Sequence, residues 1–120
     1  MYRVVVADDE PEFRAWLKST LERSNEFRVV GEAGSGTEAI RLVNSLLPDV
    51  VIADMYMPGP DGLEVVRFVQ EHCPTTKAIL ISAQEEQVYE MMAKREGALA
   101  FIPKTKMSLD TLTQSLATGN

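Results

Sequence analysis

Short apolar runs alternate with longer amphipathic stretches along the whole chain. The clearest run, Val50–Ala53, is mostly β-branched and leads straight into Asp54 and a turn rich in Pro and Gly. Runs of this kind are typical of strands buried on both faces of a parallel sheet. A more mixed segment over residues 28–33 is typical of an edge strand. The predicted strands cover residues 4–7, 28–33, 50–53, 78–81 and 99–102.

Between these runs, apolar residues recur at helical spacing. The first helix begins at Pro11, which suits the first helical turn because its missing N–H is not needed there. The inward residues of the five predicted helices are Phe13, Trp16, Leu17 and Leu21; Ala39, Ile40, Val43, Leu46 and Leu47; Leu63, Val65, Val66 and Val69; Val88, Met91 and Met92 within 85–95; and Leu109, Leu112 and Leu116. Strands that alternate with helices predict a doubly wound α/β sheet with right-handed crossovers.

Composition narrows the class of protein. The length of 120 residues suits one domain, expected over residues 1–120, and a net charge of −6 disfavours direct binding of nucleic acid. The single cysteine, Cys73, excludes an internal disulfide. No apolar run approaches the ~18 residues of a membrane span, and the start of the chain is too short and too soon acidic for a signal peptide. We therefore expect a cytoplasmic protein without membrane contact.

Polar residues stand where the predicted strands end. Asp8 and Asp9 follow the first strand, Asp54 the third, Ser82 the fourth, and Lys104 comes just after the fifth. Parallel strands bring these groups to one edge of the sheet. Carboxylates ~5 Å apart repel by about 3 kcal/mol per pair at an effective dielectric constant near 20. Such a cluster needs a cation, and oxygen donors suit Mg²⁺. With a lysine and a hydroxyl opposite, the site favours phosphoryl transfer onto Asp54.

Four segments together carry a family resemblance. They are Val6-Ala7-Asp8-Asp9, Asp54 through Gly62, Ile81-Ser82-Ala83 and Gly97 through Lys104. In this order and spacing the chain resembles, over its whole length, the receiver domain of bacterial two-component response regulators. The resemblance implies a flavodoxin-like five-stranded parallel sheet of order 2-1-3-4-5 with five helices.

The resemblance also implies the roles of the acidic residues. Asp54 would be the phospho-acceptor. Asp9 would bind Mg²⁺ directly and Asp8 mainly through water, while Asp54 and the backbone carbonyl of Tyr56 would complete the protein's ligands. The chain would catalyse only its own phosphorylation and dephosphorylation, so it would be a regulatory domain rather than an enzyme in the usual sense.

Further roles follow from the same resemblance. Lys104 and the Ser82 hydroxyl would bind the phosphoryl oxygens, and Ser82 and Phe101 would act as the switch pair. The donor would be a sensor histidine kinase. The helix at 85–95, the strand at 99–102 and the last helix would form a surface for a homodimer or an output domain. The ending Phe101 to Lys104 resembles the subgroup with a C-terminal helix-turn-helix, so DNA would be contacted only through such an output domain.

Two alternatives stay open at this point. Gly34 to Ala39 reads G-x-G-x-x-A between a strand and a helix, the pattern of a nucleotide- or dinucleotide-binding flavodoxin-like domain, but the motif follows the second strand and does not explain Asp8, Asp9 or Lys104. The other alternative is a receiver-like interaction module that is never phosphorylated. Two departures from the family are also visible. Thr105 follows Lys104 where many relatives have proline, so a cis peptide bond is not expected there, and Tyr56 is bulky where many relatives carry a smaller polar residue.

Overall fold

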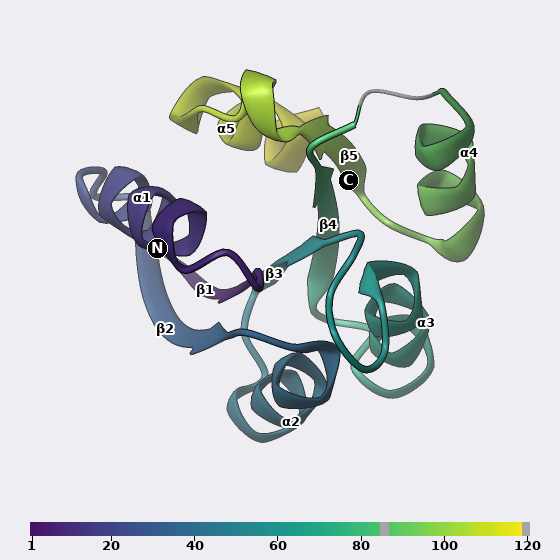
Figure 1. The fold of residues 1–120 in the computed structure, drawn as a ribbon. Coiled ribbons are helices and arrows are strands. Elements are labelled where there is room, and N and C mark those ends of the chain that lie inside the picture. The colour runs from purple at the N-terminus through teal and green to yellow at the C-terminus, as the bar shows by residue number, and fades with distance from the viewer. Residues whose placement is uncertain (85–86, 119–120) are drawn as a thin grey trace.

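A single parallel sheet with helices on both faces forms the molecule (Figure 1). The computed structural model describes residues 1–84 and 87–118. The strands are β1 (Tyr2–Ala7), β2 (Phe27–Ala33), β3 (Val50–Asp54), β4 (Lys77–Ser82) and β5 (Ala100–Pro103). The helices are α1 (Pro11–Glu22), α2 (Gly36–Leu46), α3 (Gly62–His72), α4 (Gln87–Glu96) and α5 (Leu109–Thr118), with a 3₁₀ turn at Lys104–Lys106. The order β2-β1-β3-β4-β5 confirms the predicted flavodoxin-like topology.

The two faces of the sheet carry separate cores. Val5 and Ala7 of β1 pack on the side covered by α2, α3 and α4, whereas Val4 and Val6 pack on the side covered by α1 and α5. Successive strand residues point to opposite faces. Because helices cover both faces here, consecutive residues must be apolar, which explains the unbroken apolar runs in the sequence.

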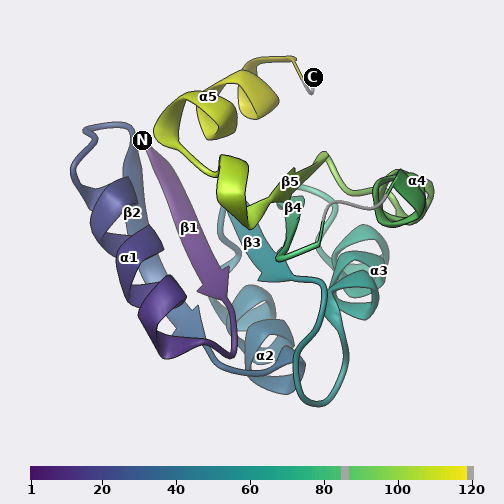
Figure 2. The same cartoon turned by 45° about the horizontal axis from the view of Figure 1, so that its top comes forward.

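The sheet places a crevice at the ends of β1 and β3. These strands are hydrogen-bonded in parallel, with Ala7 opposite Ala53, and their chains leave in different directions, toward α1 on one face and α3 on the other. Figure 2 shows β1 and β3 side by side with their following loops at one edge. Open α/β sheets bind ligands at such a point.

The prediction that Trp16 and Leu47 face inward is wrong. Trp16 is 44% exposed and rests on Phe13, with ring centroids 5.5 Å apart, because Leu17 and Leu21 form the buried stripe of α1. Leu47 is 57% exposed because it ends α2 in a left-handed conformation (φ 47°), which turns its side chain away from the helix face. Leu112 and Leu116 of the last helix are buried as predicted.

The predicted face of the helix at 85–95 is also wrong. Val88, Met91 and Met92 are exposed, and α4 instead buries Ala93 and packs Tyr89 partly against the core. Tyr89 and Ala93 are four residues apart and form one stripe, so the three larger apolar residues lie on another side. The predicted start of this helix, residues 85–86, lies outside the described residues. No peptide bond of the described chain is cis, as expected for Thr105.

Candidate functional site

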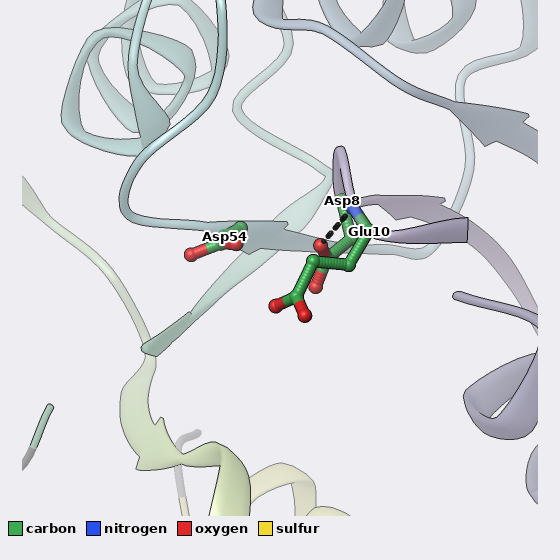
Figure 3. A group of neighbouring side chains, drawn as sticks. All are labelled: Asp8, Glu10 and Asp54. Atoms are coloured by element: carbon green, nitrogen blue, oxygen red, sulfur yellow. Dashed lines mark hydrogen bonds between the residues drawn. The ribbon is translucent and has the colours of Figure 1, made fainter. Parts of the chain in front are cut away.

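Two buried carboxylates occupy the crevice. Asp8 follows β1 directly, is fully buried, and its N–H donates to the carbonyl of Ala33 on β2. Asp54 is the last residue of β3 and is 6% exposed. A third carboxylate, from Glu10, approaches from the loop after β1 (Figure 3). The crevice therefore concentrates negative charge from two neighbouring strands.

Lys104 lies among these three carboxylates. Its Nζ is 2.8 Å from Asp8 Oδ2, 2.7 Å from Glu10 Oε1 and 3.2 Å from Asp54 Oδ2. The ammonium also stands 4.5 Å from the centroid of the Phe13 ring. Only 9% of the Lys104 side chain is exposed. One cation thus faces three carboxylates, and the pocket keeps a surplus of negative charge.

This arrangement shifts the acid–base equilibria of the site. Burial, followed by the charge of Asp8, raises the pKa of Asp54 from 3.8 to about 6, against the opposing effect of Lys104. Burial alone would lower the pKa of Lys104, but the surrounding carboxylates of Asp8, Glu10 and Asp54 raise it above its usual value. The hydrogen bond from Lys104 lowers the pKa of Glu10. The ionised form of Asp54 is therefore held at an energetic cost.

That cost leads to a stability prediction. Asp54→Asn should stabilise the metal-free domain by about 1–2 kcal/mol near neutral pH, a value reduced from the full shift because water partly screens the group. The folded pKa of Asp54 lies above its unfolded value, so ionisation destabilises the fold as pH rises through about 6. The gain should therefore vanish below about pH 4. Urea unfolding in a chelator across this range measures it. Asp110→Asn, at the exposed start of α5, is the control and should show no gain; a destabilised Asp54→Asn would contradict the prediction.

The residues of the pocket fit Mg²⁺. Asp8, Glu10 and Asp54 each offer one carboxylate oxygen, and these oxygens lie within 4.8 Å of one another. Asp8 Oδ2 is buried, and although Lys104 Nζ is close, it accepts no well-aligned hydrogen bond. An oxygen-only donor set with surplus negative charge suits Mg²⁺, which takes one or two carboxylates and keeps several waters.

Three other predicted residues lie on β4, on β5 and just after β3. Ser82 is buried at the end of β4, and its Oγ accepts a hydrogen bond from the N–H of Gln84 (3.0 Å). The N–H of Tyr56 donates to Asp54 Oδ1 (3.3 Å), while its ring meets Tyr89 of α4 edge-on at 5.8 Å. Phe101 is buried on β5.

The carboxylate cluster includes Glu10 but not Asp9. Asp9 is exposed and is not one of the three residues of the carboxylate cluster found in the described chain. Glu10, which the sequence reasoning did not single out, is one of them. The available signal was Pro11: a proline at the first position of α1 makes Glu10 the N-cap residue, next to the crevice. The ligand role of Asp9 stays a prediction.

The fold and the pocket together define a class: a doubly wound α/β domain with a lysine-bridged acidic site at its topological switch point. A family model described as the response regulator receiver domain matches residues 4–117. The chain belongs to this family.

Three similar proteins carry the comparison further. The chain is 41% identical over 102 residues to the probable transcriptional regulatory protein NarL of Mycobacterium tuberculosis (strain ATCC 25618 / H37Rv). This alignment covers 85% of this chain and 47% of that protein. It is 32% identical over 112 residues to the transcriptional regulatory protein LiaR of Bacillus subtilis (strain 168), covering 92% and 52%. The solved signal receiver domain of NarL from M. tuberculosis superimposes with a TM-score of 0.87 at 37% identity, covering 96% of each chain. The chain spans about half the length of the curated relatives it matches.

Proposed function

We propose that this domain is a phosphorylation-controlled switch in which Asp54 accepts a phosphoryl group from a phosphohistidine of a sensor histidine kinase. The observation that carries the proposal is the placement of Asp54: its carboxylate is buried in the crevice, 3.2 Å from the ammonium of Lys104 and beside Asp8. A structural ion pair would need one carboxylate, whereas this pocket holds three around one cation.

In the transfer, an Asp54 carboxylate oxygen bonds to phosphorus as the phosphorus–nitrogen bond of the donor breaks, and the imidazole leaves. Lys104 neutralises charge on the transferred oxygens. The hydroxyl of Ser82 now accepts from Gln84, so its own proton is available to a phosphoryl oxygen. Mg²⁺ would be held directly by Asp9, Asp54 and the Tyr56 carbonyl and mainly through water by Asp8, and it would neutralise the remaining charge. Hydrolysis of the product resets the switch.

The test uses a small acyl-phosphate donor with Mg²⁺. Intact mass should rise by one phosphoryl group in the wild type and not at all in Asp54→Asn. Asp49→Asn, an aspartate at the opposite end of β3, should be labelled like the wild type. Equal labelling of Asp54→Asn and wild type would refute the assignment of Asp54, and an unlabelled wild type would favour the interaction module that is never phosphorylated.

Mg²⁺ should also stabilise the folded domain. The ion binds only the assembled pocket and relieves repulsion among its carboxylates. At ~100 times its dissociation constant, the unfolding free energy should rise by about 2.7 kcal/mol. Thermal unfolding with and without millimolar Mg²⁺ at constant ionic strength measures this gain, which should fall sharply in Asp54→Asn. A melting temperature that Mg²⁺ leaves unchanged would contradict the shared metal site.

We propose that the output surface of the switch lies along β5, between α4 and α5. A groove there is lined by residues of α4, β5 and α5, among them Gln87, Glu90, Phe101 and Gln114. Phosphorylation that moves Ser82 and Phe101 would reshape this surface, which we assign to a homodimer or an output domain.

The twofold greater length of relatives with regulatory names supports a C-terminal DNA-binding domain in the whole protein. No described helix is long and apolar enough to cross a membrane.

A further inference from the structure

The shortest ion pair of Lys104 is with Glu10, and its geometry differs from that of the other two. Glu10 Oε1 lies 2.7 Å from Nζ, against 2.8 Å for Asp8 and 3.2 Å for Asp54. Asp8 and Asp54 are buried at the ends of strands, whereas 63% of the Glu10 side chain is exposed. Lys104 is therefore held from within the protein by two carboxylates and from the solvent side by a third.

The position of Glu10 on its own helix supports a specific role for this contact. Glu10 is the N-cap residue of α1, yet its side chain makes no capping hydrogen bond. Its backbone is fixed, because its N–H donates to Asp8 Oδ1 (2.8 Å) and its carbonyl accepts from the N–H of Arg14 (3.0 Å). An N-cap side chain commonly satisfies the free N–H groups of the first turn. Here the side chain extends to Lys104 instead.

Phosphorylation changes what Lys104 must bind. An ammonium has three N–H donors, and the three carboxylates already surround them. A phosphoryl oxygen on Asp54 needs at least one of these donors. Asp8 cannot withdraw, since it is fully buried at the end of β1. Glu10 can withdraw into solvent by rotating its side chain, so it is the partner that the ammonium exchanges for phosphate.

We infer that Glu10 is a positioning residue that restrains the ammonium of Lys104 in the unphosphorylated domain and is displaced when the phosphoryl group arrives. The inference rests on the proposed function, which it deepens. Removing the restraint frees one donor and removes a negative charge beside the entering phosphate. Both effects act in the same direction, so the loss of Glu10 should speed phosphorylation.

The experiment compares three variants with two measurements. Glu10→Gln removes the charge; Glu10→Asp keeps it, but the side chain is about 1.5 Å shorter and at an N-cap bonds to its own helix. Glu12→Gln removes the same charge from the exposed first turn of α1, two residues away, and is the control. The first measurement is trace acetylation of Lys104 by acetic anhydride in metal-free protein, relative to exposed Lys77 of the same molecule. The second is the rate of labelling by acetyl phosphate, at Mg²⁺ concentrations that saturate each variant.

We expect Lys104 acetylation to rise several-fold in Glu10→Gln and Glu10→Asp, with a phosphorylation rate at least twofold higher in both. Glu12→Gln should match the wild type in both measurements. Unchanged acetylation in the Glu10 variants, or equal effects of Glu12→Gln and Glu10→Gln, would overturn the inference. A slower phosphorylation of both Glu10 variants would overturn it as well. If acetyl phosphate labels no variant, the proposed function fails, and the acetylation result alone decides whether Glu10 restrains Lys104.

Discussion

Gly36→Ala should lower the unfolding free energy by about 3 kcal/mol, at the upper end of the range for overpacking, because a β-carbon there meets backbone that cannot yield locally. That carbon would lie 1.8 Å from the carbonyl oxygen of Pro60 and 2.6 Å from its carbonyl carbon. The N–H of Gly36 also donates to the carbonyl of Pro58 (3.1 Å). The loop that runs from Asp54 to α3 is therefore packed directly on the first residue of α2.

Gly34→Ala is the matched control for this prediction. It lies two residues earlier in the same turn, and the nearest atom to its added β-carbon is the end of the Arg14 side chain at 3.5 Å, an ordinary contact. Urea unfolding of both variants in saturating Mg²⁺ measures the difference. We also expect slower labelling of Asp54 in Gly36→Ala, since the loop after Asp54 must shift. A Gly36→Ala variant within 0.5 kcal/mol of Gly34→Ala would show that the loop accommodates the methyl group.

Lys104→Met should destabilise the metal-free domain by about 2–3 kcal/mol near neutral pH. Lys104 is the cation between Asp8 and Asp54, so its loss leaves two buried carboxylates facing each other. The pKa of Asp54, already raised to about 6, should rise further because Lys104 is one of the groups that lower it. Protonation of Asp54 then removes the repulsion, and the destabilisation should shrink as pH falls through that raised pKa.

Urea unfolding in a chelator at about pH 5 and pH 7.5 tests this pH dependence. Lys106→Met is the control, because Lys106 is exposed in the same 3₁₀ turn and contacts none of the three carboxylates. In the double variant Lys104→Met with Asp54→Asn, the loss should be smaller than in Lys104→Met alone, since only one buried carboxylate stays ionised. A Lys104→Met variant as stable as Lys106→Met at both pH values would mean that the ion pairs contribute nothing net.

The sequence predicted the sheet and the main pocket because both depend on local patterns. Unbroken apolar runs such as Val50–Ala53 identify strands covered on both faces, and polar residues directly after them identify the carboxyl edge. The topology then brings Asp8, Asp54 and Lys104 to the same edge of the sheet. The G-x-G-x-x-A motif is ambiguous from sequence alone, because a bound cofactor and a tightly packed loop can both require glycine at position 36.

The sequence-based predictions failed in two respects: how far a side chain extends, and which face of a helix is turned toward the core. Glu10 enters the pocket only because its side chain extends along the surface to Lys104, which no spacing rule states. The few apolar residues of this helix predict Val88, Met91 and Met92 as its inward face, yet the helix is rotated so that Ala93 faces the core. A small buried residue lets a helix approach closely, and volume alone therefore predicts the wrong face.

Helix α4 buries little of its surface against the core, and this affects which substitutions the helix can tolerate. The other four helices each bury at least two apolar residues, whereas Ala93 is the one buried residue of α4. Substitutions along most of α4 therefore cost little core packing. Recognition of new partners can evolve on this helix while Asp8, Asp54 and Lys104 keep the same chemistry at the edge of the sheet. An engineer could likewise change the exposed residues of α4 to redirect the output without redesigning the proposed phosphorylation site.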